Sequence, residues 1–184
     1  MNWIWWGLFC LGLVARAATA AEPGSGPSEY QVKAVFVFNF VKFTDWPATT
    51  FTNGTAPIVI GIVGENPFGA ALEEVVKAET ISGHPFVLKQ FQPGDDLSRC
   101  QVLFFSRRIK ESLPALLATL KHKPVLTVSD CDAFCEQGGM VNLALAGSGT
   151  VHPEINPSAA RIAGVQISSK LLNLPTVRLV QTER

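Results

Sequence analysis

The sequence predicts an α/β fold, in which a single domain has a mostly parallel or mixed central sheet with helices on both of its faces. Short apolar, β-branched runs recur along the chain and alternate with segments whose apolar residues follow helical spacing. Strands that alternate with helices pair largely in parallel, and a parallel sheet needs helices over both faces. About 160 residues follow the expected N-terminal leader, which is enough for one domain with its own core.

The N-terminus has the pattern of a secretory signal peptide covering residues 1–21. Residues 2–14 are apolar and uncharged, and the small residues that follow allow cleavage after Ala20 or Ala21. A retained membrane anchor is the alternative, but an apolar stretch of roughly 13 residues is shorter than the ~20 that a spanning helix needs. Residues 22–28 then form a flexible lead-in, so we expect the folded domain to occupy residues 29–184.

The charge composition narrows the class of partner. The chain has 15 basic and 15 acidic residues, and its formal net charge is +0. A near-neutral, evenly mixed surface argues against nucleic acid or an anionic membrane as the main partner. We therefore expect neither nucleic acid binding nor direct membrane insertion after cleavage of the signal peptide.

Residues 30–46 favour a long helix over a strand. Phe36, Phe38 and Phe40 alternate as they would in a strand, but about 17 residues is long for a single strand. Ser28 is suited to cap the N-terminus of such a helix. The helix would be apolar on nearly every side, so we expect it in the core. The alternative is that its surplus phenylalanine surface meets a second copy of the chain.

From there strands and helices alternate. Strands are expected at residues 57–63, 86–91, 101–106, 125–128, 140–145 and around 151–155. Helices are expected at residues 68–77, 109–121, 157–163 and 168–174. A turn at residues 64–69 joins the first of these strands to the first of these helices.

The motifs that would indicate an enzyme are weak. The glycines at 61, 64 and 69 follow a strand and precede a helix, but they lack both the Lys-Ser/Thr of a phosphate-binding loop and the spacing of a dinucleotide fingerprint. The histidines are far apart and have no ligand-like spacing, and no nucleophile lies beside a base. We therefore predict no catalytic, cofactor-binding or metal site, and we expect that the protein is not an enzyme.

Three cysteines follow the expected signal peptide. Cys131 and Cys135 lie close together between two strands, and in an oxidising compartment a local disulfide is the favoured interpretation. Such a short bridge would be either an inert clip or a strained, redox-sensitive switch. Thiol-oxidoreductase chemistry is disfavoured because the spacing is not C-x-x-C. Cys100 is left as an unpaired, buried thiol, or as an intermolecular bridge if it proves accessible.

The residues also carry a family resemblance. Ordered motifs across the expected mature chain resemble the YfiR family of periplasmic proteins, among them Tyr30-x-Val-Lys-Ala34, Asn39-Phe40-x-Lys-Phe43-x-x-Trp46-Pro47, Cys100-Gln-Val-Leu-Phe-Phe-Ser106 and Glu154-Ile-Asn156. No single motif identifies the family, but the occurrence of all of them in the same order along the chain is specific to it. The chain departs from the pattern at His152-Pro153, where the family more often has an aromatic residue.

The resemblance implies a small α/β domain that is exported to the periplasm, usually dimeric, and not an enzyme. The best-understood members bind the periplasmic part of an inner-membrane diguanylate cyclase and hold it inactive, which lowers cyclic di-GMP and biofilm formation. Members can use cysteine pairs to tie repression to the redox state of the periplasm. Cys135, next to Phe134, stands where the family often carries a cysteine.

These expectations give a hypothesis for partner binding. We expect the loop around Phe134, stiffened by the Cys131–Cys135 bond, to present an exposed aromatic side chain to the cyclase, with Glu154 as a charge at the rim. The alternative is a periplasmic small-ligand-binding component that acts with a sensor kinase or transporter. Its ligand crevice would lie at the carboxyl ends of the strands, near residues 64–68 and 129–130.

Overall fold

The computed structural model describes residues 27–147 and 149–181, so the expected signal peptide lies outside the described residues. The helices are α1 (Glu29–Lys42), α2 (Ala71–Val76), α3 (Leu113–Leu120), α4 (Pro157–Ile162) and α5 (Ser169–Leu172). The strands are β1 (Thr44–Asp45), β2 (Ile58–Val63), β3 (Thr80–Ile81), β4 (His84–Phe91), β5 (Val102–Phe105), β6 (Leu126–Ser129), β7 (Val141–Leu145), β8 (Val151–Ile155), β9 (Gln166–Ile167) and β10 (Arg178–Leu179).

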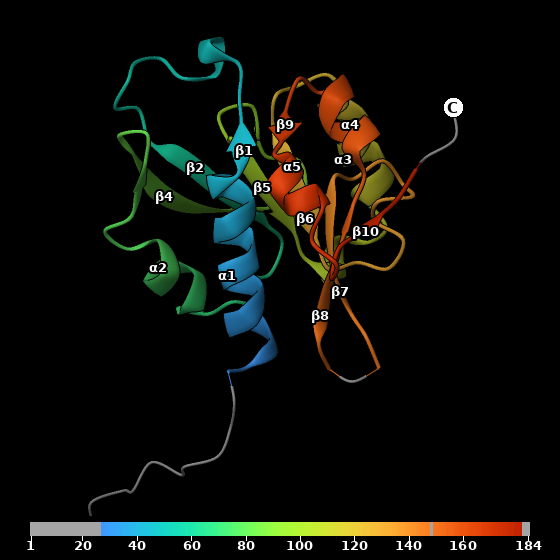
Figure 1. Cartoon of the computed structure of the whole chain (residues 1–184). Coiled ribbons are helices and arrows are strands. Elements are labelled where there is room, and N and C mark those ends of the chain that lie inside the picture. The colour runs from blue at the N-terminus through green and yellow to red at the C-terminus, as the bar shows by residue number, and fades with distance from the viewer. Residues whose placement is uncertain (1–26, 148, 182–184) are drawn as a thin grey trace, which may run out of the picture.

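The fold class is confirmed. An 8-stranded mixed sheet runs in the order β10-β8-β7-β6-β5-β2-β4-β3, and β1 pairs with β9 in a separate small sheet (Figure 1). The central pairs β2–β4, β2–β5, β5–β6 and β6–β7 are parallel, whereas β7–β8 and β3–β4 are antiparallel. The domain is a single α/β unit with helices on both faces of this sheet.

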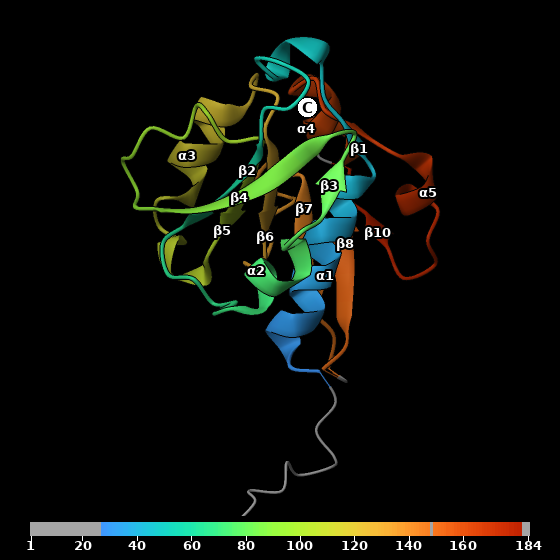
Figure 2. The ribbon, with the colours of Figure 1, turned by 90° about the vertical axis from the view of Figure 1, so that its left-hand side faces the viewer.

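The sheet divides the core into two layers, and β5 shows how. Side chains alternate across a strand, so Val102 and Phe104 pack with α1 and α2 on one face. Leu103 and Phe105 instead pack with α3 on the other face. Figure 2 shows α3 on the opposite side of the sheet from α1. Because β5 is buried on both sides, its sequence is a continuous apolar run rather than an alternating one.

The N-terminal helix begins where its capping signal stands. The Ser28 hydroxyl accepts a hydrogen bond from the Gln31 backbone, and the Gln31 side chain accepts one from the Ser28 backbone, which completes a capping box. The helix ends at Lys42, earlier than expected, because the chain then extends as β1 to pair with β9. Among the described residues, no helix is both long enough and apolar enough to cross a membrane.

Other boundaries shift where a local signal overrides the apolar pattern. The helix expected from residue 109 begins only at Leu113, because a 3-10 turn at Arg107–Ile109 comes first and Pro114 favours the first turn of a helix. The short strands β3, β9 and β10 were not predicted, since strands of two residues leave no periodicity in the sequence.

Candidate functional site

The segment that joins β6 to β7, residues 130–140, holds most of the residues singled out in the sequence. We call it the cysteine loop. It is anchored to three parts of the fold: to α1 at its start, to the core beneath α3 in its middle, and to β8 near its end.

The first anchor is a buried charged cluster around Asp130, a residue that is 2% exposed. One carboxylate oxygen of Asp130 accepts hydrogen bonds from Lys33 Nζ at 2.7 Å and from the Tyr30 hydroxyl at 2.9 Å. Arg107 donates to the Asp130 backbone carbonyl at 2.9 Å, and Lys33 also pairs with Glu29. Buried charges need such partners, because removing one would leave the other uncompensated.

The buried charged cluster was not among the sequence-based expectations. Lys33 and Asp130 are 97 positions apart, so no local spacing connects them. A signal was nevertheless present, since Lys33 is a charged residue within an otherwise apolar stretch of α1. The cluster also affects Tyr30, because burial and the hydrogen bond to Asp130 raise the pKa of its phenol to about 12.

The second anchor is Phe134, and here the expectation of an exposed aromatic side chain is wrong. Phe134 is 0% exposed, and its ring centroid lies 6.1 Å from that of Phe105 in the core beneath α3. Ala133 has φ of 55°, a left-handed conformation that turns the following side chain inward. Gly139 lies against the ring, where an added Cβ would be 2.2 Å from it. Phe134 is therefore a structural residue of the loop.

The two cysteines of the loop point toward different neighbours. Cys131 carries a free thiol in the core beneath α3, 3.9 Å from the carbonyl oxygen of Ser106. The sulfur of Cys135 instead lies 3.4 Å from the carbonyl oxygen of Glu154 on β8. Between these two described residues the expected disulfide is therefore not formed, because the left-handed Ala133 interrupts the helical turn that would put both sulfurs on one face.

All three described cysteines are buried and poorly ionised. Burial and the nearby carboxylates raise the pKa of the Cys135 thiol to about 12. Burial likewise raises the pKa of Cys131, and it raises that of Cys100, a free thiol just before β5, to about 11. Since the thiolate is the reactive form, none of these groups has the environment of a catalytic or readily oxidised cysteine.

The third anchor leads to a charged surface cluster. Glu154 accepts hydrogen bonds from Asn142 at 2.9 Å and from Arg178 Nε at 3.0 Å. Arg178 also contacts Glu136 at 3.2 Å. The parallel register of β8 and β10 places Arg178 opposite Glu154, which explains this pairing. We call Glu136, Glu154 and Arg178 the edge ion cluster. Because Glu136 belongs to the cysteine loop and the other two residues belong to β8 and β10, the cluster ties the loop to the edge of the sheet.

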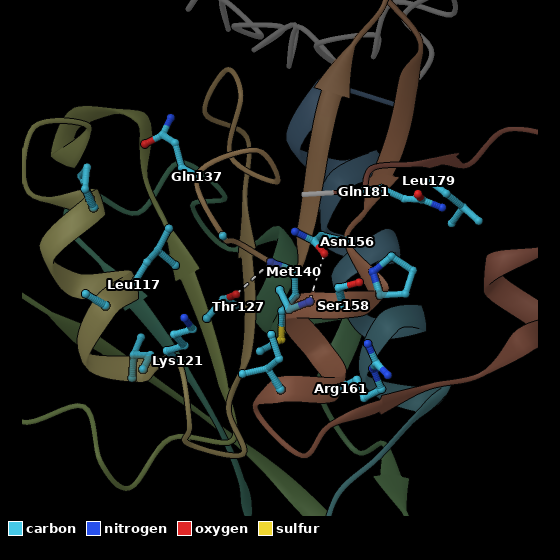
Figure 3. A pocket seen from close by; sticks show the side chains of 17 residues that line it. Leu117, Lys121, Thr127, Gln137, Met140, Asn156, Ser158, Arg161, Leu179 and Gln181 are labelled. Atoms are coloured by element: carbon cyan, nitrogen blue, oxygen red, sulfur yellow. Dashed lines mark hydrogen bonds between the residues drawn. The ribbon is translucent and has the colours of Figure 1, made fainter. Parts of the chain in front are cut away.

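A cavity of about 790 Å³ lies on the other side of the loop, between α3 and α4 (Figure 3). The cysteine loop contributes Gln137, Gly138 and Met140 to its wall. The crevice expected near residues 64–68 and 129–130 does not coincide with it. No group of three or more His, Cys, Asp or Glu side chains among the described residues is arranged to hold a metal ion.

A comparison with protein families identifies the chain. A family model described as YfiR/HmsC-like matches residues 30–176, which include the whole cysteine loop. The chain belongs to the YfiR/HmsC-like family. No curated protein matches the sequence significantly.

Proposed function

We propose that this YfiR/HmsC-like protein is a periplasmic regulator that binds the periplasmic part of an inner-membrane diguanylate cyclase and keeps the enzyme inactive. The observation that carries the proposal is the family match over residues 30–176. A regulator of this kind works by binding the inactive state of its partner more tightly than the active state, since only differential affinity moves a conformational equilibrium. It needs no catalytic group of its own.

The contact surface that we propose is the edge ion cluster. Of the two partner contacts expected from the sequence, we keep only Glu154. Phe134 is buried and cannot meet a partner without local unfolding. The side chains of Arg178 and Glu136 are 58% and 44% exposed, so both charges are accessible to a partner. Arginine is among the residues that most often dominate the energy of a protein–protein contact.

A charge-swap experiment in cells tests this surface. The gene is deleted in its own host, and the wild-type gene or a variant is then reintroduced into the chromosome. Cellular cyclic di-GMP is measured in each strain. Deletion should raise cyclic di-GMP, and the wild-type gene should lower it again. The variants Glu136→Lys and Arg178→Glu should each fail to repress, because each reverses one charge that the partner meets.

The triple variant Glu136→Lys/Glu154→Lys/Arg178→Glu is the decisive control, because it reverses all three charges of the edge ion cluster and so rebuilds both ion pairs of residue 178 with opposite polarity. If the cluster is only structural, the triple variant represses normally and the proposed surface is wrong. If the cluster meets the cyclase, the triple variant fails as the single ones do. Glu73→Lys, an exposed change on α2, should repress like wild type. If deletion leaves cyclic di-GMP unchanged, the proposed function itself is refuted.

The predicted homodimer also belongs to this proposal, and α1 offers a surface for it. Val35 on α1 is 47% exposed, and Val32 and Phe36 line an apolar groove of about 500 Å³ between α1 and α2. Exposed apolar surface of this kind is typical of contacts between protein copies. Sedimentation equilibrium should show a dimer for wild type and a monomer for Val35→Glu, whereas Leu145→Glu, an equally apolar exposed site on β7, should leave the dimer intact. A wild-type monomer would refute this part.

A further inference from the structure

The cavity between α3 and α4 is lined mainly by aliphatic side chains. Leu117 and Leu120 come from α3, Ile162 from α4, Leu179 from β10 and Met140 from the cysteine loop. Its volume of about 790 Å³ falls within the range of small-molecule sites, roughly 300–1,000 Å³. Among the described residues that line it, none is aromatic. A flat ring would therefore find no stacking partner there, whereas an aliphatic chain would be well accommodated.

The charges at the cavity are all of one sign. Lys121 at the end of α3 and Arg161 in the last turn of α4 flank the same end of the cavity from opposite walls, while Gln137 lies toward the other end (Figure 3). No Asp or Glu is found in the described lining, and neither cation forms an ion pair with another described residue. Each cation offsets the negative end of its own helix, but that role does not explain an apolar cavity between them.

We propose that this cavity binds a free aliphatic monocarboxylate, with the carboxylate between Lys121 and Arg161 and the chain along Leu117 and Met140. An arginine and a lysine can both donate charge-assisted hydrogen bonds to a carboxylate. The aliphatic wall removes the chain from water, which favours binding in proportion to the apolar area covered.

A ligand in this cavity would affect the edge ion cluster through the cysteine loop. The consequence for partner binding rests on the proposed function. Met140 lines the cavity, and its backbone donates to the Thr127 hydroxyl at 3.1 Å. Asn156 also lines the cavity and donates to the Cys135 carbonyl at 2.9 Å. Glu136 of the edge ion cluster is the next residue after Cys135. A ligand that holds Met140 and Asn156 therefore also stiffens the segment that carries Glu136.

The test uses the mature protein and four probes: decanoate, decan-1-ol, decyltrimethylammonium and butyrate, all below their micelle-forming concentrations. Decanoate should raise the melting temperature and give saturable heat in calorimetry. The alcohol and the cation lack the carboxylate, and butyrate lacks the chain, so each should bind at least roughly tenfold more weakly, as expected for the loss of one charge-assisted hydrogen bond or of most buried methylenes. Equal responses to all four probes would overturn the proposal.

Variants locate the site. Lys121→Gln/Arg161→Gln should lose decanoate binding, and Lys89→Gln/Lys170→Gln, which removes two exposed lysines elsewhere, should keep it. Decanoate should slow hydrogen exchange of residues 131–140 in wild type but not in the Lys121→Gln/Arg161→Gln variant. Unchanged affinity in that variant, or binding to phosphatidylglycerol vesicles in place of free decanoate, would overturn the proposal. None of these measurements involves the cyclase, so the ligand site and the proposed function can fail separately.

Discussion

Replacing Phe134 by alanine tests whether the ring anchors the cysteine loop in the core beneath α3. The ring is 0% exposed and packs in a cluster that includes Phe105 and Leu113, both also 0% exposed. Truncation removes this buried surface and leaves a cavity, which in well-packed cores costs about 3–5 kcal/mol. The loop is better able to relax than a strand, so we expect the lower end, about 3 kcal/mol. That is a large share of the ~5–15 kcal/mol that stabilises an ordinary domain.

Equilibrium urea unfolding of the mature protein measures this loss directly, and thermal unfolding gives a second value. For a domain of this size, about 3 kcal/mol corresponds to a fall of roughly 6–12 °C in melting temperature. Phe134→Leu keeps most of the apolar volume and should cost about 1 kcal/mol. Asp132→Ala changes an exposed residue of the same loop and should stay within about 0.5 kcal/mol of wild type.

Two results would refute the reasoning. A cost below about 1 kcal/mol for Phe134→Ala would mean that the ring is not packed as described. A Phe134→Leu variant that is as stable as wild type but no longer represses would mean that the ring meets the partner, as first expected from the sequence.

Three further predictions concern the same region. Tyr30 is the single tyrosine of the chain, so its ionisation can be followed by ultraviolet absorbance; it should titrate near pH 12 rather than 10, and Asp130→Asn should lower this value. Because the pKa of Tyr30 is raised in the folded state, the stability that Tyr30 contributes is fully present below pH 10 and is lost as the pH rises through about 12. A Tyr30 titration near pH 10 would contradict the hydrogen bond to Asp130. Gly139→Ala should cost about 1–3 kcal/mol in urea unfolding, because its Cβ would enter the adjacent ring. Cys100 and Cys131 should react with a thiol reagent only after denaturant is added, and rapid labelling of the native protein would show that they are not buried.

Local signals made much of the fold predictable. The capping box at Ser28 uses residues only three positions apart. The continuous apolar run of β5 is typical of a strand that is buried on both faces. The helix expected at residues 157–163 is observed at Pro157–Ile162, where Asn156 caps its start and proline stands in the first turn. Each of these signals is complete within one short stretch of sequence, so no knowledge of tertiary contacts was needed.

The site was harder to predict because its determinants are not local. The burial of Phe134 depends on a left-handed backbone at Ala133, and alanine gives no sign of that conformation. Gly138 and Gly139 were the available hint, since consecutive glycines often mark a tight turn or a close approach of the chain. The pair does not say which side chain makes the close approach, and in the structure it is the Phe134 ring that lies against Gly139.

The anchors of the cysteine loop change what a cysteine variant should do. Asp130 holds the start of the loop through Lys33, and the Cys135 carbonyl holds its end through Asn156, so neither anchor uses a sulfur–sulfur bond. We therefore expect Cys131→Ala to cost about 1–3 kcal/mol for the buried sulfur it removes but to repress the cyclase as wild type does. Cyclic di-GMP in the deletion strain carrying this variant measures the outcome, with stability checked by urea unfolding. Loss of repression by a stably folded Cys131→Ala protein would show that a disulfide stiffens the loop after all, and the packing described here would not be what holds the edge ion cluster in place.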